Sequence, residues 1–129
     1  MPKILIVEDS DDLLDMYKIV FSKFKFEMTP ISTKETLVRQ LVLNRPDIIL
    51  LDIHLNGEDG REICKGIKQN KEFSSIPIII TSGSTEKLAA CAEYFADDAL
   101  QKPFDVTVLI EKINTLLLTN KDAASTTIK

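Results

Sequence analysis

Hydrophobic runs without alternation recur along the chain, and each ends at polar or charged residues. Residues 3–7, 48–52 and 76–80 consist mostly of Ile, Leu and Val. Such runs are typical of strands buried on both faces, as in a parallel sheet covered by helices. Two weaker segments, residues 26–31 and 99–101, complete a predicted set of five strands.

The segments between these runs carry apolar residues at helical spacing, with charged residues between them. We expect helices after an N-cap at Ser10 or Asp11, from the capping-box spacing Ser32-Thr33-Lys34-Glu35 to Asn44, around Ile63 and Ile67, from Thr85 to Phe95, and after an N-cap at Asp105. Strands alternating with helices predict an α/β fold, a doubly wound parallel sheet with right-handed crossovers.

The positions of individual strands and the ends of the domain can also be predicted. Pro30 has no amide proton to donate, so we expect residues 26–31 to form an edge strand. Residues 1–118 are predicted to form one domain. The polar residues 119–129 lack periodicity and are expected to form a tail that frays.

Composition narrows the class of protein. The 129 residues are 44% hydrophobic and 28% charged, as in a globular domain, and no apolar run approaches the roughly 20 residues of a bilayer span. A net charge of −4 without a basic cluster argues against nucleic-acid binding. Cys64 and Cys91 fit no metal or disulfide pattern, and no export signal precedes the first strand, so we expect a cytoplasmic protein without membrane contact.

Residues with charged or hydroxyl side chains follow several of the predicted strands. The carboxyl ends of parallel strands meet at one edge of a sheet, which would bring together Glu8, Asp9, Asp52, Thr81 and Lys102. Three carboxylates repel one another unless a positive charge lies among them. A hard divalent cation such as Mg²⁺ would supply that charge, and Lys102 would supply a second.

The same set of residues suggests a reaction. A carboxylate can attack phosphorus and form an aspartyl phosphate. Asp52 is the best candidate nucleophile because it ends the central strand, and Glu8 and Asp9 would then hold the metal. Lys102 and the Thr81 hydroxyl could stabilise the negative phosphoryl oxygens.

These residues resemble those of response-regulator receiver domains, the phosphoacceptors of two-component signalling, and in particular the single-domain chemotaxis kind. The resemblance covers about residues 3–118 and rests on four segments in order: Val7-Glu8-Asp9, Leu51-Asp52-Ile53 through Asp59-Gly60, Thr81, and Lys102-Pro103-Phe104. It implies a flavodoxin-like strand order 2-1-3-4-5 and a switch rather than an enzyme.

The resemblance also implies roles for the site residues. Asp52 would accept a phosphoryl group from a histidine kinase or phosphotransfer protein, and Thr81 and Lys102 would bind it. Asp9 would bind Mg²⁺ directly, Glu8 through water, and the backbone carbonyl of His54 would be a further ligand. The Lys102-Pro103 bond would be cis. A monomer or weak dimer would then pass the signal to another protein through the face formed by the fourth helix, fifth strand and fifth helix.

Some features depart from the family pattern or leave other functions open. Ala99 stands where receivers carry an aromatic residue, and Tyr94 or Phe104 could replace it. Phe95 stands where a glycine is common, and Asn56 where a proline is common. The alternatives are a docking module that is not regulated by phosphorylation, a Mg²⁺-dependent phosphohydrolase, which commonly needs a second acid where His54 stands, and a flavin-binding domain, whose phosphate Glu8 and Asp9 would repel.

Overall fold

The fold places five parallel strands in a central sheet between two layers of helices. The computed structural model describes residues 1–128, and side chains as far as residue 120. Strands and helices follow one another in the order β1 (Lys3–Val7), α1 (Asp11–Lys23), β2 (Glu27–Ile31), α2 (Lys34–Leu43), β3 (Ile48–Asp52), β4 (His54–Leu55), β5 (Glu58–Asp59), α3 (Gly60–Lys68), β6 (Ile78–Ser82), α4 (Thr85–Ala89), η1 (Cys91–Tyr94), β7 (Asp98–Gln101) and α5 (Val106–Ile128).

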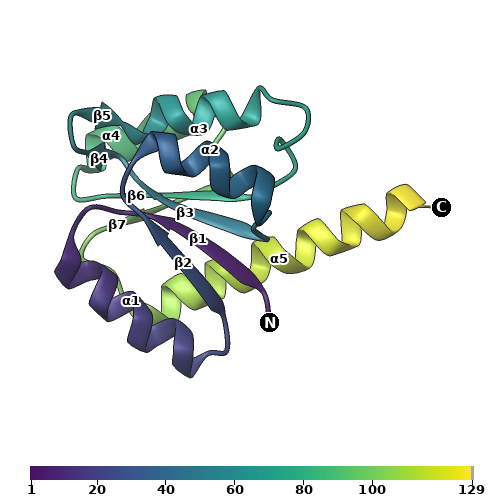
Figure 1. Cartoon of the computed structure of the whole chain (residues 1–129), viewed down its shortest axis with the longest axis horizontal. Helices are drawn as coiled ribbons and strands as arrows, with labels where there is room; N and C mark the ends of the chain where they lie inside the picture. Colours follow the sequence, from purple (N-terminus) through teal and green to yellow (C-terminus); the bar gives the residue numbers. More distant parts are fainter. Residues whose placement is uncertain (129) are drawn as a thin grey trace.

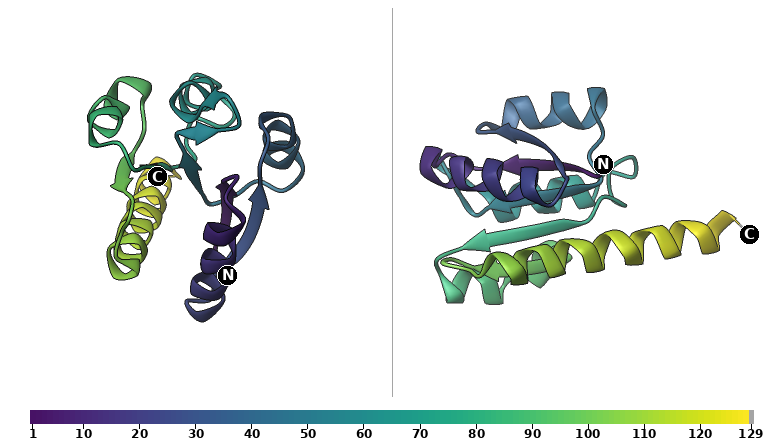
Figure 2. Two further views of the ribbon diagram at one scale, coloured as in Figure 1. Left: turned by 90° about the vertical axis from the view of Figure 1, so that its left-hand side faces the viewer. Right: turned by 90° about the horizontal axis from the view of Figure 1, so that it is seen from below.

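The strand order is β2-β1-β3-β6-β7, with all neighbours parallel. This confirms the predicted sheet, its flavodoxin-like order and the edge position of the strand that contains Pro30. Seen along the strands, α2, α3 and α4 cover one face and α1 and α5 the other (Figures 1 and 2). All five strands therefore end at the same edge, on the left in Figure 1.

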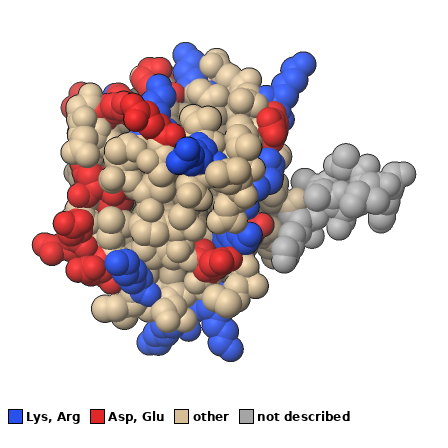
Figure 3. Space-filling view, in the orientation of Figure 1, with Lys and Arg blue, Asp and Glu red and all other residues tan. Residues whose placement is uncertain are grey.

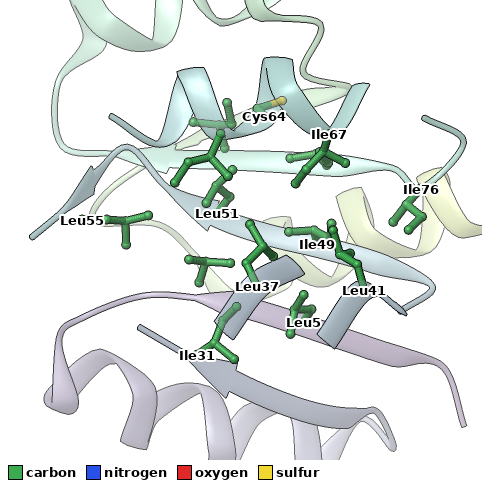
Figure 4. Close-up of a cluster of buried hydrophobic side chains, with 14 of the residues drawn as sticks. Leu5, Ile31, Leu37, Leu41, Ile49, Leu51, Leu55, Cys64, Ile67 and Ile76 are labelled. Carbon is green, nitrogen blue, oxygen red and sulfur yellow. The ribbon is translucent and has the colours of Figure 1, made fainter. Parts of the chain in front are cut away.

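Each face of the sheet has its own hydrophobic core. Figure 4 shows the core under α2 and α3, where Leu37 and Leu41 of α2 and Ile67 of α3 meet the strand residues Leu5 and Ile49. The opposite core joins the sheet to α1 and α5 and includes Tyr17, whose ring stacks on those of Phe21 and Phe104. β3 is buried along its whole length, which fixes the position of Asp52 at its end.

Two local predictions are wrong. The N-cap of α2 is Thr33 rather than Ser32, because the Thr33 hydroxyl accepts the Thr36 amide proton at 3.3 Å. The helix predicted from Thr85 to Phe95 is divided into α4 and the 3₁₀ turn η1, because the Ala90 amide donates to the Lys87 carbonyl three residues back. Phe95 then ends the turn at a φ of +67°.

The final helix begins after Asp105, whose carboxylate accepts the Thr107 amide proton at 2.7 Å, as predicted. The helix then continues to Ile128 and shows no end at residue 118. The predicted domain boundary at residue 118 therefore does not coincide with a helix end, and it stays a prediction. Residue 129 and the side chains after residue 120 lie outside the described part of the chain.

Candidate functional site

The carboxyl edge of the sheet brings together the acidic residues singled out from the sequence. Carboxylate oxygens of Glu8, Asp9 and Asp52 all lie within 4.8 Å of one another. Glu8 and Asp52 are buried, with 2% and 6% exposure, whereas Asp9 is open to solvent. In Figure 3 many of the acidic side chains gather along the left edge, where the strands end in Figure 1. The predicted convergence of these three carboxylates is thus present.

Lys102 lies among these carboxylates. Its Nζ is 2.9 Å from Oε1 of Glu8 and 3.4 Å from Oδ2 of Asp52. Its position is set from β6, because the Lys102 amide donates to the Ser82 carbonyl at 2.8 Å. The bond that follows, Lys102-Pro103, is cis. One ammonium therefore partly neutralises both buried carboxylates.

Glu8 is held by further contacts. Its Oε2 accepts the amide protons of Asp9 at 3.0 Å and Ser10 at 3.2 Å, at the start of α1. Burial raises the pKa of the Glu8 carboxyl, and the Asp52 charge raises it further, while the hydrogen bond from Lys102 opposes this rise. A buried acid with a raised pKa is a common feature of functional sites.

Thr81 lies opposite Asp52 on the neighbouring strand. The two residues are register partners between β3 and β6, so their side chains point to the same face of the sheet. Thr81 is only 1% exposed. Thr81 is thus a direct neighbour of Asp52 at the carboxyl edge, where the sequence predicts it.

The loop after Asp52 folds back as a two-residue hairpin. β4 and β5 pair through His54 with Asp59 and through Leu55 with Glu58, around a turn in which Asn56 and Gly57 both have positive φ. This is the turn that an Asn-Gly pair favours. The predicted turn-rich loop is therefore a short hairpin, and its Asn56 amide donates to Asp9 Oδ2 at 3.1 Å.

A hollow of about 460 Å³ opens beside this hairpin. Its lining includes Asp9, His54 and Asn56, together with Lys87 of α4. The hollow reaches the exposed residue Asp9, so the acidic cluster is open to solvent there.

Tyr94 and Phe104, the aromatic residues considered as replacements at position 99, have other neighbours. Phe104 stacks on Tyr17, with ring centroids 6.2 Å apart. The Tyr94 ring lies under the guanidinium of Arg61, 5.0 Å from its Cζ. The contact between Arg61 and Tyr94 was not expected from the sequence, since no pattern links α3 to η1.

Comparison with known proteins identifies the family. A family model described as the response regulator receiver domain matches residues 4–114. The chain belongs to this family. Receiver domains are signalling modules that interact with histidine kinases or phosphotransfer proteins and bind Mg²⁺ at an acidic site, and this chain has an acidic cluster of Glu8, Asp9 and Asp52.

Individual relatives agree with this assignment. The chain is 31% identical over 119 residues to the sensory transduction protein BceR of Halalkalibacterium halodurans, and 34% identical over 114 residues to the transcriptional regulatory protein YxdJ of Bacillus subtilis. These alignments include 91% and 88% of this chain but only 50% and 49% of the relatives, so the chain spans about half of their length.

A solved receiver domain has the same fold. The signal receiver domain of a signal transduction histidine kinase from Syntrophus aciditrophicus superposes with a TM-score of 0.84. The identity is 28%, and the match includes 92% of each chain. None of the helices in the described part of our chain combines the length and apolarity that crossing a bilayer requires.

Proposed function

We propose that this receiver domain accepts a phosphoryl group on Asp52 from a histidine kinase or phosphotransfer protein. A carboxylate oxygen of Asp52 would attack the phosphorus of a phosphohistidine. The new O–P bond forms as the P–N bond breaks, and the electron pair leaves with the imidazole. The observation that best supports this proposal is the meeting of Glu8, Asp9, Asp52 and Lys102 at one edge.

The donor set suits Mg²⁺. Three carboxylates whose oxygens lie within 4.8 Å of one another form a site of hard oxygen ligands. Asp9 and Asp52 would bind the ion directly, with the His54 backbone carbonyl as a further ligand. Glu8, already engaged by Lys102 and two amide protons, would bind through water. The ion would supply positive charge to the phosphoryl oxygens during transfer.

Two further residues would bind the transferred group. The Thr81 hydroxyl lies on the face of the sheet that Asp52 occupies, and the Lys102 amine is already 3.4 Å from the Asp52 carboxylate. Once phosphoryl oxygens are present, Lys102 would pair with them, as they carry more negative charge than the Glu8 carboxylate. Spontaneous hydrolysis would later release the phosphate, and no other catalytic activity is proposed.

Phosphorylation would shift the surface formed by α4, β7 and α5 between two states and so alter binding of another protein or another domain. Glu86 and Glu93 are exposed on this side, whereas Lys87 lies beside the hollow. With a net charge of −4, this chain would bind nucleic acid only through a partner. We expect a monomer or weak dimer, in the cytoplasm where kinases draw on ATP.

The test is the mass of the intact protein after incubation with Mg²⁺ and acetyl phosphate. We expect the wild type to gain one phosphate, and the gain to disappear when EDTA removes Mg²⁺. Asp52→Asn should gain none, whereas Asp15→Asn, an exposed acid of α1, should behave as the wild type. If the wild type gains nothing while another receiver is labelled, a docking role without phosphorylation becomes the better explanation.

A further inference from the structure

Arg61 joins two segments that are far apart in the sequence. Its Nη2 lies 2.8 Å from Oδ2 of Asp59, and its Nε donates to Oδ1 of the same carboxylate at 3.1 Å. The same guanidinium lies over the ring of Tyr94, with 5.0 Å between Cζ and the ring centroid. The Arg61 side chain is only 17% exposed. One cation thus contacts both the start of α3 and the turn η1.

The Asp59 side of this contact is tied closely to the phosphoacceptor edge. Asp59 pairs across the hairpin with His54, and His54 is two residues after Asp52 in the sequence. The neighbouring Gly60 donates its amide proton to the Ile53 carbonyl at 2.7 Å. Gly60 also lies so near the end of β3 that a Cβ on it would be 2.1 Å from the Asp52 carbonyl oxygen. With no space between them, a shift of the chain at Asp52 must move the start of α3.

Asp59 itself is fixed in a charged state. Its Oδ1 accepts the Arg61 amide proton at 2.9 Å and so caps α3. The hydrogen bonds from Arg61 hold the pKa of the Asp59 carboxyl below its usual range, and the charge of Lys87 lowers it further. The ion pair therefore persists at neutral pH, and a two-pronged pair of this kind transmits orientation as well as charge.

On the other side of Arg61, the backbone is strained directly after Tyr94. Phe95 follows Tyr94 at a φ of +67°, a left-handed conformation that is unfavourable for a residue with a Cβ. α4 before it is only five residues long. A short helix, a 3₁₀ turn and a strained residue in succession form an element that a small change in contact energy can rearrange.

We propose that Arg61 is a positioning residue that couples the phosphorylation state of Asp52 to η1, through Asp59 on one side and the Tyr94 ring on the other. The coupling rests on the proposed phosphoacceptor function. Phosphorylation adds bulk and negative charge at the end of β3, the hairpin and Asp59 adjust, and Arg61 moves against Tyr94. Ala99 in β7 has no ring through which such a change could pass.

The chain's own tyrosines allow a direct test. It has two tyrosines and no tryptophan, so Tyr17→Phe leaves Tyr94 as the single tyrosine fluorophore. The Tyr17→Phe protein is incubated with Mg²⁺ and acetyl phosphate, and its mass and tyrosine emission are recorded on the same sample. We expect the emission to change in step with the gain of one phosphate.

The decisive comparison adds a second substitution. In Tyr17→Phe with Arg61→Gln, we expect the phosphate gain to remain and the emission change to be lost. Arg39→Gln is the matched control, because Arg39 is exposed on α2 and makes no ion pair among the described side chains, and it should keep both signals. If Arg61→Gln does not fold, Arg61→Lys, which keeps the charge but not the two-pronged geometry, should reduce the emission change.

Two results would overturn the coupling while leaving the phosphoacceptor function intact. One is a phosphate gain without any emission change in the Tyr17→Phe protein. The other is an emission change that persists when Arg61 is replaced, since Tyr94 would then sense the phosphate directly. If no form of the protein gains phosphate, the proposed function fails, and the coupling fails with it.

Discussion

The Lys102 ammonium lies 2.9 Å from the Glu8 carboxylate. Among the described side chains, it is the only positive charge within 4.0 Å of the buried carboxylates of Glu8 and Asp52. Burial of Glu8 raises the pKa of its carboxyl, and the Lys102 hydrogen bond limits that rise. We therefore expect Lys102 to stabilise the resting protein, in addition to its proposed role in binding a phosphoryl group.

Lys102→Met should reveal this contribution to stability. Removing the cation leaves two buried carboxylates without a counter-charge, so we expect the free energy of unfolding to fall by about 2 kcal/mol without metal. Urea unfolding at neutral pH measures it, with Lys18→Met, an exposed lysine of α1, as the control. Added Mg²⁺ should stabilise the Lys102 variant more than the wild type. Equal stability of the two proteins without metal would contradict the account.

Two glycines of α3 should respond in opposite ways to alanine. A Cβ on Gly60 would meet the Asp52 carbonyl oxygen at 2.1 Å, whereas a Cβ on Gly66 would meet nothing within 4 Å. We expect Gly60→Ala to destabilise the protein by at least about 2 kcal/mol, because backbone must move. Gly66→Ala should stabilise it by about 0.5–1 kcal/mol. Thermal unfolding of both variants would test this. A Gly60→Ala protein as stable as the wild type would refute the close packing of Gly60 against the end of β3.

At position 95, we expect phenylalanine to give a less stable protein than glycine would. Its φ of +67° strains any residue that carries a Cβ, and its side chain is 52% exposed. Phe95→Ala loses the ring but keeps the strain, whereas Phe95→Gly loses both. We therefore expect the glycine variant to be more stable than the alanine variant by about 1 kcal/mol in chemical unfolding. The reverse order would show that the backbone is not strained there.

The hydroxyl of Tyr17 is buried without a hydrogen-bond partner in the described part of the structure. An unpaired buried hydroxyl is unfavourable, so Tyr17→Phe should raise the free energy of unfolding at pH 7 by about 1 kcal/mol. Denaturant melts of the two proteins measure it. A large loss of stability instead would mean that the hydroxyl has a partner.

The Tyr17 effect should grow at alkaline pH. Burial, and then the charges of Glu8 and Asp52, raise the pKa of the folded Tyr17 phenol above 10.0, so the unfolded chain loses this proton first. Folding stability is thus kept below pH 10 and lost as pH rises toward the folded value. The advantage of Tyr17→Phe should widen by up to about 1.4 kcal/mol per pH unit above 10. A constant difference from pH 8 to 11 would contradict this.

Most of the sheet could be predicted from the sequence because its strands are unbroken apolar runs. The edge position of β2 followed from Pro30, and the convergence of Asp52 with Glu8 followed from the shared direction of parallel strands. These features depend on the residue pattern within each strand and on the shared direction of strands in a parallel sheet.

Other features depend on contacts that no local pattern encodes. The break between α4 and η1 is visible only where the hydrogen bonding changes at Ala90 and Phe95 takes a positive φ. The pairing of Arg61 with Tyr94 joins residues that share no spacing. Tyr17 lies at an apolar position of the helical pattern of α1, which predicts that its ring is buried. The pattern does not show that its hydroxyl has no hydrogen-bond partner among the described residues.

Locating the phosphoryl group tests most directly whether Asp52 is the phosphoacceptor. Borohydride reduces an aspartyl phosphate to homoserine, and peptide mass spectrometry then identifies the position. After treatment with acetyl phosphate and Mg²⁺, we expect homoserine at position 52 alone, and none when EDTA is present. Homoserine at position 9, or a labelled protein without homoserine at position 52, would contradict it.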